Sequence, residues 1–442
     1  MVDYSKLHIF GAGPAGLAAG YYANKKNISF KIYESSGKVG GNCKTICDDQ
    51  FRFDTGAHRF HDKYDEITFE IKNLMGEQLK KVEAPSKIYY QGGMIEFPLN
   101  IASIINHFDK STLLKIIIEN IKNMINRKHH DHNFEALAYQ TYGKTLSKQF
   151  LINYTEKLWG SPAHTLDANI SGNRLKHLDI SSLLRQLLFK SKNVNHLDGS
   201  FYYPKYGFGT IFEKIIDKID NNSIQYHSPI KKIFHEDGKI IKVFYGDNKT
   251  ENVNRVISTL PINILINALE PAPPKQIIDI VNSIQYRNLY LCVLYLDRPY
   301  FSDNASIYFP ESTYPFTRIY EPKNRSMEMA PKDKTCIVIE IPYDQKMGEL
   351  SSTPKEKIIE QTSNILINNG LIKKEEIIGN KLMDLQYAYP VLHLGSKAKL
   401  DNIFSYLSNL KNLYIIGRNA QFEYTHIHNI FKHASLLIDR IS

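Results

Sequence analysis

Long hydrophobic runs are missing from this sequence. No apolar stretch reaches the roughly 18 residues that a membrane-spanning helix needs, which argues against an integral membrane protein. Cysteine is scarce too: Cys43, Cys47, Cys292 and Cys336 show no metal-binding or redox spacing, so we expect no disulfide framework. The first predicted strand begins almost at once and leaves no room for a signal peptide, so the expected location is a reducing cytoplasm.

Internal repeats, low-complexity segments and a second G-x-G-x-x-G at a strand end are also absent. The last absence argues against a separate NAD(P)H-binding domain. The net charge is +9, but no basic stripe is interleaved with aromatic residues, which argues against nucleic-acid binding. An excess of positive charge suits a phosphate-bearing substrate or an anionic membrane surface, and a solvated lysine-rich surface explains it equally well.

The strongest motif is LHIFGAGPAGLAAGYYANKKNISFKIYE, near the start of the chain. A short apolar strand meets Gly11, Gly13 and Gly16, a helical pattern follows, and a second strand ends at Glu34. This is the fingerprint of a dinucleotide-binding βαβ unit in its required context. The helix N-terminus offers free N–H groups to a pyrophosphate, and the carboxylate of Glu34 suits a ribose hydroxyl. The motif therefore favours NAD or FAD over NADP.

A second glycine pair moves the prediction from NAD to FAD. Gly40 and Gly41 follow in SSGKVGGNCKT, and FRFDTGAHRFH then carries Gly56 and His58. Such a second pair is typical of flavoproteins, where it lies along the pyrophosphate and ribityl chain, and NAD dehydrogenases lack it. The cofactor-binding residues predicted in this part of the chain are Gly11, Gly13, Pro14, Ala15, Gly16, Glu34, Gly40, Gly41, Asn42, Gly56, Ala57 and His58.

The pattern changes beyond this unit. Residues 84–100 predict a hairpin that turns at Gly92–Gly93, and residues 101–169 are mostly helical. His129, His130 and His132 stand in a polar link without a further ligand, so no metal site is predicted.

One amphipathic helix is predicted over 111–127, with Ser111 as its N-cap. It is interpreted as a member of a helical bundle, and the alternative is a helix that makes weak contact with a membrane surface. Its apolar face comprises Leu113, Leu114, Ile117, Ile118, Ile121, Met124 and Ile125.

The nucleotide-binding unit is predicted to be discontinuous. Short strands over 230–256 lead into VISTLP, alternating apolar strands dominate 264–390, and NLYIIGRN predicts a late strand before a C-terminal helix. The predicted class is α/β: a discontinuous Rossmann-like FAD-binding domain, an inserted helical segment and a mixed β-sheet substrate domain. The predicted blocks are 1–84, 201–262 and 395–442 for FAD binding, 85–200 for a hairpin and helical cap segment, and 263–394 for the substrate domain.

The whole chain resembles the amine-oxidase-like flavoprotein superfamily, and within it the UDP-galactopyranose mutase family. GGNCKT, TGAHRFH and FPLN are similar to motifs of that family. NFEALAYQTYGKTLSKQFLINYTEKLWG, residues 133–160, fits its pattern without a gap. QYRNLY and AYP place Arg287 and Tyr389 where the family has an arginine and a tyrosine, and GRNAQFEYTHIHN resembles its last flavin motif.

The resemblance implies a reaction that needs reduced FAD, supplied by an external reductant, but has no net redox change. In the family, flavin N5 attacks the anomeric carbon of a nucleotide-linked sugar, the nucleotide diphosphate departs, and the sugar ring recloses at a different size. The resemblance implies that Arg174 and Arg287 clamp the diphosphate and that Tyr389 and Tyr424 donate to its oxygens. It also implies flavin contacts from His58, Gly417, Arg418 and Ile427, with the helix near His428 directing its N-terminus at the flavin.

Two stretches depart from the mutase pattern. After Arg174, a predicted helical segment over 179–192 and GSFYYPKYGFG replace the expected aromatic and acidic residues, and Thr425 and His426 alter the last motif. FYYPKYGFGTIFEKI resembles redox members such as protoporphyrinogen oxidases and desaturases.

Two alternatives to the mutase therefore stay open. One is a true FAD oxidoreductase that oxidises a C–N or C–C bond and passes electrons to oxygen or a quinone. The other is a flavin-binding partner protein without turnover. Each implied site residue also has a structural alternative: a surface position for Arg174, an ion pair for Arg287, a structural role for His58, and core packing for Tyr389, Tyr424 and Trp159. The sequence leaves the substrate and the oligomeric state open.

Overall fold

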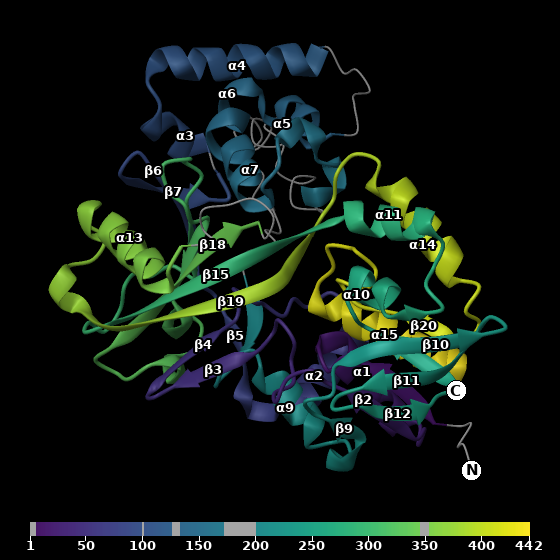
Figure 1. The fold of residues 1–442 in the computed structure, drawn as a ribbon. Coiled ribbons are helices and arrows are strands. Elements are labelled where there is room, and N and C mark those ends of the chain that lie inside the picture. Colours follow the sequence, from purple (N-terminus) through teal and green to yellow (C-terminus); the bar gives the residue numbers. More distant parts are fainter. Residues whose placement is uncertain (1–5, 100, 126–132, 172–199, 345–352) are drawn as a thin grey trace.

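The computed structural model describes residues 6–99, 101–125, 133–171, 200–344 and 353–442 (Figure 1). Arg174, the segment predicted to be helical over 179–192, and the three histidines His129, His130 and His132 lie outside these residues. Within the described ranges, none of the helices has the length and apolar character that crossing a bilayer requires.

A parallel sheet at the lower right of Figure 1 contains the predicted βαβ unit, which is confirmed. Its strand order is β20-β13-β1-β2-β9, so stretches far apart in the sequence lie side by side. All four pairings are parallel, and β1 is fully buried because other elements cover both faces of the sheet. The strands are β1 (Leu7–Phe10), β2 (Phe30–Tyr33), β9 (Ile224–Gln225), β13 (Arg255–Ser258) and β20 (Leu413–Ile415).

Helices cover one face of this sheet. The helix α1 (Pro14–Lys25) connects β1 to β2 and shares a hydrophobic core with α9 (Thr210–Ile216) and α15 (Ile427–Ile441). The other face packs on a four-stranded sheet and on helices from later in the chain. These elements are β10 (Ile230–Glu236), β11 (Lys239–Tyr245), β12 (Lys249–Asn252), β14 (Leu269–Glu270), α10 (Ile262–Asn267), α11 (Lys275–Ser283) and α14 (Ser396–Leu407).

A mixed seven-stranded sheet forms the other half of the molecule, in the order β19-β15-β18-β17-β16-β6-β7. Its only parallel pair is β16 with β6. The two long strands β15 and β19 cross Figure 1 from this sheet towards α11 and α14. The strands are β6 (Ser86–Tyr90), β7 (Gly93–Phe97), β15 (Gln285–Leu296), β16 (Ser306–Tyr308), β17 (Arg318–Tyr320), β18 (Thr335–Tyr343) and β19 (Ile377–Val391), and α13 (Lys355–Asn368) packs on one face.

Smaller elements join the two halves. The hairpin of β3 (Thr45–Asp48) and β4 (Phe51–Asp54) follows the second glycine pair, and β5 (Leu79–Val82) pairs with β8 (Phe201–Pro204). The predicted hairpin at residues 84–100 is confirmed as β6 and β7. Where the domain boundaries fall stays a prediction.

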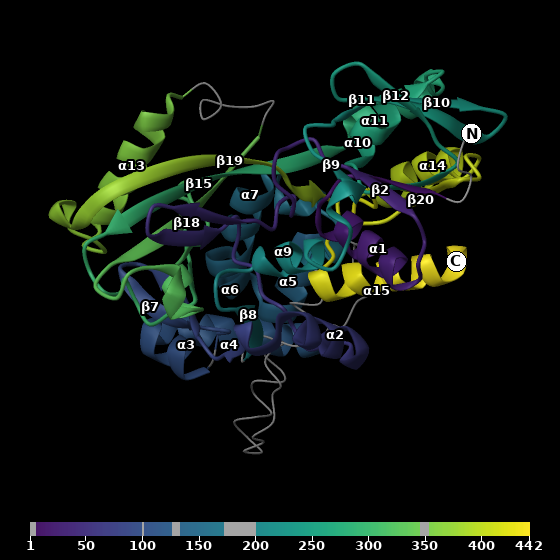
Figure 2. The same cartoon turned by 90° about the horizontal axis from the view of Figure 1, so that it is seen from below.

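A group of helices lies over one end of the seven-stranded sheet, at the top of Figure 1, and confirms the mostly helical prediction for 101–169. The long helix α4 is its outermost layer, and Figure 2 shows α2, α3 and α4 along one edge of the molecule. The helices of this group are α3 (Ile101–His107), α4 (Lys110–Ile125), α5 (Phe134–Tyr142), α6 (Lys144–Leu146) and α7 (Asn153–Trp159), with a π-helical turn over Ser147–Ile152. The helix α2 (Asp65–Met75) packs instead in the core that α1 shares with α15.

Two predictions for α4 are wrong. The N-terminal cap is Asp109 and not Ser111, because the Asp109 carboxylate accepts the N–H groups of Ser111 at 2.9 Å and Thr112 at 3.1 Å. The interpretation as a bundle helix also implied that the apolar face would be buried, but six of its seven residues are exposed. The helix turns a largely polar face inward, where the Nδ2 groups of Asn120 and Asn123 donate to carbonyls in the last turn of α5, at 3.0 Å to Tyr142 and 2.7 Å to Tyr139. The end of a helix leaves such carbonyls unsatisfied, which explains why α4 presents asparagines to it.

Candidate active site

The first glycine motif contains one glycine required by packing and one facing open space. A Cβ atom on Gly16 would lie 1.9 Å from the carbonyl oxygen of Gly11, so only glycine lets α1 approach the turn after β1. Gly11 itself has φ +96°, which glycine adopts without strain. A Cβ on Gly13 would meet only the Cα of Gly41, at 3.9 Å. Protein packing alone does not require glycine at position 13.

The turn also leaves the start of α1 open. Gly13 is its N-cap, Pro14 is its first residue, and no side chain caps the helix and no acid lies in its first turn. The N-terminal N–H groups and the positive end of the helix dipole are therefore available to an anion. Glu34, buried at the end of β2, accepts the N–H of Ala12 at 2.9 Å on one oxygen and the N–H of Ser36 at 2.9 Å on the other.

The second glycine pair packs directly against the first motif. The N–H of Gly40 donates to the carbonyl of Ala12 at 2.8 Å, and a Cβ on Gly41 would lie 3.1 Å from the Cα of Gly13. The next residue, Asn42, reaches out of this region: its Nδ2 donates to the carbonyls of Gln386 at 3.0 Å and Tyr387 at 3.1 Å. The glycine turns are therefore tied to β19 of the seven-stranded sheet.

The segment before α15 closes the same region. A Cβ on Gly417 would lie 2.9 Å from the Cβ of Ala15, so this segment runs against the start of α1, and the predicted flavin residue Ile427 is the first residue of α15. Buried polar groups almost always have a hydrogen-bond partner. Several in this segment have none within the described ranges: Arg418 Nε, Asn419 Oδ1, Gln421 Oε1 and His428 Nε2. We call the glycine turns, the start of α1 and this segment the cofactor cradle, and their unfilled backbone and side-chain groups fit a bound dinucleotide.

His58 lies at the edge of the cofactor cradle. Its Nε2 is 3.0 Å from the carbonyl oxygen of Asn42, an arrangement in which Nε2 carries the proton and donates it. Burial is the main cause that lowers the pKa of His58 to about 3, so the ring is neutral at physiological pH. Gly56 lies directly below the ring, since a Cβ there would be 3.0 Å from His58 Nε2, and Ala57 links the two.

An aromatic cluster adjoins the cradle. The Trp159 ring lies 5.5 Å from Tyr389 and 6.0 Å from Tyr424, between centroids and in edge-to-face geometry. The guanidinium of Arg418 lies 4.3 Å from the Tyr424 ring and 5.3 Å from the Tyr389 ring. Burial and then the charge of Glu340 raise the pKa of Tyr389, so its hydroxyl stays protonated. The structure thus brings together three of the predicted residues, from β19 and from the segment before α15.

Arg287 stands beside this cluster, opposite Tyr389 in the pairing of β15 with β19. Its Nε donates to the carbonyl of Leu158 at 3.1 Å and its Nη2 to the carbonyl of Lys157 at 3.3 Å, so it caps the last turn of α7. Burial lowers the pKa of Arg287. The ion pairs found among the described residues include neither Arg287 nor Arg418, but the charge of Asp344 acts on Arg287 and partly opposes the effect of burial on its pKa. Both guanidinium groups can therefore still bind an anionic ligand.

A second group in the same site was not predicted from the sequence. Arg318 forms a two-pronged ion pair with Glu340, with Nη2 to Oε1 at 2.7 Å and Nε to Oε2 at 3.0 Å. Burial has the largest single effect and lowers the pKa of Arg318, but the charge of Glu340 together with Tyr389, Tyr308 and Tyr154 raises that pKa overall. The rings of Tyr154 and Tyr308 lie beside the pair, 6.0 Å apart. The pair depends on the antiparallel register of β17 with β18, and no local spacing in the sequence signals it.

Histidines gather at the start of α15, which was also not predicted. The rings of His426 and His428 stack at 5.6 Å, and His61 lies 6.4 Å from His426. Burial is the first cause that lowers the pKa of His428 to about 4. The acid that the mutase pattern has at position 426 is thus replaced by a histidine whose ring stacks on that of His428.

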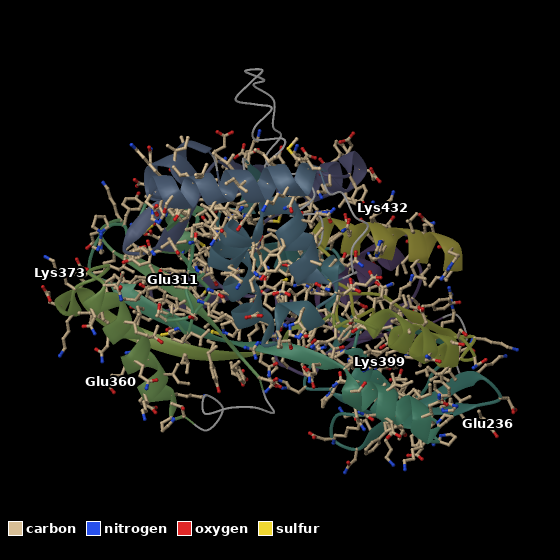
Figure 3. The ribbon with its side chains drawn as sticks, turned by 90° about the horizontal axis from the view of Figure 1, so that it is seen from above. Glu236, Glu311, Glu360, Lys373, Lys399 and Lys432 are labelled. Atoms are coloured by element: carbon tan, nitrogen blue, oxygen red, sulfur yellow. The ribbon has the colours of Figure 1, made fainter. Side chains whose placement is uncertain are left out.

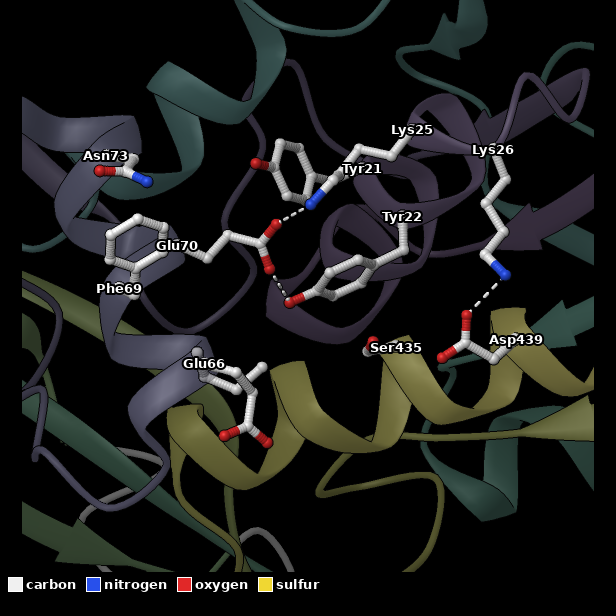
Figure 4. Close-up of a pocket in the computed structure, with 11 residues that line it drawn as sticks. Tyr21, Tyr22, Lys25, Lys26, Glu66, Phe69, Glu70, Asn73, Ser435 and Asp439 are labelled. Carbon is white, nitrogen blue, oxygen red and sulfur yellow. Dashed lines mark hydrogen bonds and ion pairs between the residues drawn. The ribbon is translucent and has the colours of Figure 1, made fainter.

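A depression of about 550 Å³ lies elsewhere, between α1, α2 and α15 (Figure 4). Its charges are already paired, Lys25 with Glu70 and Lys26 with Asp439 at 2.6 Å. It lies along the C-terminal half of α1, away from the glycine turns. It therefore does not belong to the candidate active site.

Known proteins share this fold and parts of the sequence. The solved structure of reduced UDP-galactopyranose mutase superposes with a TM-score of 0.87 over 99% of this chain and 95% of its own, at 18% identity. The dTDP-fucopyranose mutase of Escherichia coli is 24% identical over 226 residues, 48% of this chain and 54% of the mutase. The mitochondrial protoporphyrinogen oxidase of Nicotiana tabacum is 26% identical over 121 residues, 26% of this chain and 24% of the oxidase.

The matched stretches thus span about half of the fucopyranose mutase and a quarter of the oxidase. The model of one family, described as flavin containing amine oxidoreductase, matches residues 14–368. This chain therefore belongs to the flavin containing amine oxidoreductase family, and its cofactor is FAD.

Proposed function

We propose that this protein uses reduced FAD to isomerise the sugar of a nucleotide diphosphate sugar without net redox change. The observation that carries the proposal is the charge of the site. Arg418 lies in the cofactor cradle and Arg287 lies beside it, and neither belongs to an ion pair found among the described residues, although the charge of Asp344 acts on Arg287. A departing diphosphate is stabilised by two such cations.

The proposed binding of FAD follows from the open groups of the cradle. The start of α1 and Gly13 hold the pyrophosphate, and Glu34 accepts a ribose hydroxyl. Next along the cofactor come Gly40, Gly41 and Asn42, which lie beside the part of FAD that connects the pyrophosphate to the flavin ring. The segment from Gly417 to Ile427 holds the flavin ring at the positive end of α15, which favours a reduced, anionic flavin. When bound, the reduced flavin supplies a nucleophilic nitrogen.

The chain's own residues have the task of holding the leaving group. Arg287 and Arg418 bind the diphosphate oxygens, and the hydroxyls of Tyr389 and Tyr424 donate to them. Arg174, which lies outside the described residues, is proposed as a further cation on sequence resemblance alone. His58 is neutral and already donates to Asn42, so it positions the segment beside the cradle and does not transfer a proton.

The names of two related proteins support the substrate class, since one is a mutase of dTDP-fucopyranose and the other of UDP-galactopyranose. These two compounds are the first substrates to test. The experiment adds each to oxidised enzyme and to dithionite-reduced enzyme without oxygen. A mutase gives a ring-contracted product only with the reduced enzyme and leaves the spectrum of the oxidised flavin unchanged. Bleaching of oxidised flavin by substrate would contradict the proposal.

Replacing Arg287 by Ala sharpens the test. We expect turnover to fall by about a hundredfold or more, because one charge-assisted contact to the leaving group is lost, while FAD content is retained. Arg298→Ala is the matched control, because Arg298 lies at the far end of β15 and pairs with Glu376 at 3.3 Å. Equal turnover in the two variants would remove Arg287 from the site.

The alternative is an FAD-dependent oxidoreductase that oxidises a C–N or C–C bond. It is favoured by the match to protoporphyrinogen oxidase and by the description of the family as amine oxidoreductases. Its signature is bleaching of the oxidised flavin by a substrate under anaerobic conditions, followed by recovery when oxygen or a quinone is added.

A further inference from the structure

The outermost helix of the molecule, α4, exposes an apolar stripe. Six large hydrophobic side chains on it are between 43% and 76% exposed: Leu114, Ile117, Ile118, Ile121, Met124 and Ile125. At 100° per residue they share one half of the helix. Scattered exposed hydrophobic residues are ordinary on protein surfaces, but a continuous stripe along a whole helix indicates an interaction site.

The charged residues of α4 are also distributed unevenly around the helix. Glu119 is the only acid between Lys110 and Ile125, and it points inward. There its carboxylate accepts hydrogen bonds from the backbone N–H of Thr145 at 2.7 Å and from the hydroxyl of Thr145 at 2.9 Å. Lys115 and Lys122 are exposed, and at 100° per residue they lie about 40° to 60° beyond the edge of the stripe. The outward half of α4 therefore carries apolar and positive side chains but no negative one.

The opposite half of α4 explains why the stripe faces outward. Ile116 and Asn120 are the buried residues, and Asn120 and Asn123 donate to the end of α5. These contacts fix the rotation of the helix about its axis. The view in Figure 3 places α4 along the margin of the molecule with side chains projecting away from it.

We propose that α4 lies on the surface of an anionic lipid bilayer, with its apolar stripe in the headgroup region and its lysines at the phosphates. An apolar face with a lysine-rich flank is the composition of helices that lie in the interfacial plane. The site is independent of the flavin chemistry.

A second copy of this chain is the less suitable partner. The stripe is about 24 Å long and about 10 Å wide for a helix of this length, or roughly 250 Å². A stable dimer buries about 800 Å² on each partner. Two copies meeting along this helix would also bring the lysines of both flanks together.

The test is co-sedimentation of the flavin-loaded protein with vesicles of phosphatidylcholine, with and without phosphatidylglycerol. We expect binding to the anionic vesicles, weakened by salt because the lysine contribution is screened. The double variant Ile117→Asp with Ile121→Asp should lower the affinity about tenfold or more, since it places two charges in the stripe. Ile378→Asp is the matched control, because Ile378 is 46% exposed on β19, close to the 48% of Ile121.

Two further measurements keep the proposal falsifiable. Lys115→Glu with Lys122→Glu should weaken binding to anionic vesicles without affecting FAD content or thermal stability. Ile121→Trp should give tryptophan fluorescence that brominated lipids quench, whereas Trp159 is buried and should not respond.

Failure of the wild type to bind anionic vesicles would overturn the proposal, as would equal losses in the Ile378→Asp control. It would also be overturned if the wild type were a dimer that the stripe variant converts to a monomer.

Discussion

The cofactor cradle and the arginine–aromatic site lie side by side but are built by different means. In the cradle, backbone approaches backbone, as where Gly40 donates to Ala12, and the important feature of most positions is a missing side chain. In the neighbouring site, long side chains from α7, β15, β17, β18 and β19 converge. The comparison suggests that the first region selects a cofactor by space and the second selects a substrate by charge.

The largest expected effect distinguishes a glycine that leaves room for the cofactor from a glycine that the protein's own packing requires. Gly13→Val should weaken FAD binding by about a thousandfold, or about 4 kcal/mol, and give a folded, colourless protein. The reason is that a side chain at Gly13 meets little of the protein and enters the proposed place of the pyrophosphate. Flavin absorbance per mole of purified protein measures the loss.

The contrasting variant is Gly16→Val, which should fail to fold because its Cβ would lie 1.9 Å from the carbonyl oxygen of Gly11. A yellow, stable Gly13→Val protein would show that the cradle does not select by space.

The second prediction tests whether the two regions are separate. Glu340→Gln leaves the cation of Arg318 in the site without its carboxylate, and we expect the free energy of unfolding to fall by about 3 kcal/mol. FAD content should stay near that of the wild type. Urea unfolding followed by circular dichroism measures the change. The control is Glu360→Gln on the exposed side of α13, labelled in Figure 3, which should cost less than about 0.5 kcal/mol. Colourless Glu340→Gln protein would mean that the regions are not separable.

The third prediction concerns the start of α15, where the two regions meet. The pKa of His428 is about 4 in the folded protein, below its unfolded value of about 6.5. Between these values the unfolded state binds more protons, so stability is lost as the pH falls below about 6.5. From about pH 7 to about pH 5 the loss is about 2 kcal/mol.

In His428→Asn the pH dependence of the urea midpoint should be correspondingly flatter. His433→Asn, at an exposed position on the same helix, should keep the slope of the wild type. The same slope in both variants would place the acid sensitivity elsewhere in the molecule.

The smallest expected effect concerns the link between the regions. Asn42→Ala removes the donor that reaches Gln386 and Tyr387, and we expect a loss of about 1 kcal/mol in unfolding free energy with FAD retained. Thermal unfolding suffices to detect it. Asn402→Ala is the control, because the Nδ2 of Asn402 bonds only within α14. A loss of unfolding free energy larger than that of Glu340→Gln would mean that the link between the regions contributes more to stability than the Arg318–Glu340 ion pair.

The sequence predicted the cofactor cradle better than the arginine–aromatic site, because the two regions are built from contacts over different distances along the chain. Gly11, Gly13, Gly16 and Glu34 lie within a single βαβ unit, so their spacing alone determines where they meet. Arg318 and Glu340 meet only through the register of β17 with β18, which depends on long-range pairing. Spacing cannot supply that information.

The error on α4 has a different cause. A helical wheel identifies the apolar half of α4 correctly, but it cannot show which half the rest of the protein covers. That choice was decided by Asn120 and Asn123, which are polar and yet face inward because the end of α5 needs donors. Sequence periodicity therefore identified the apolar half of the helix but not which half packs against the rest of the protein.

The strand order of the parallel sheet has a consequence for biosynthesis. The strand β1 needs β13 as its neighbour, and β13 needs β20, which begins at Leu413. At about 5 to 20 residues per second, a ribosome takes on the order of tens of seconds to translate from β1 to β13. Throughout that interval β13 has not been synthesised, so one edge of β1 has no partner strand, and such an unpaired edge can pair with other chains.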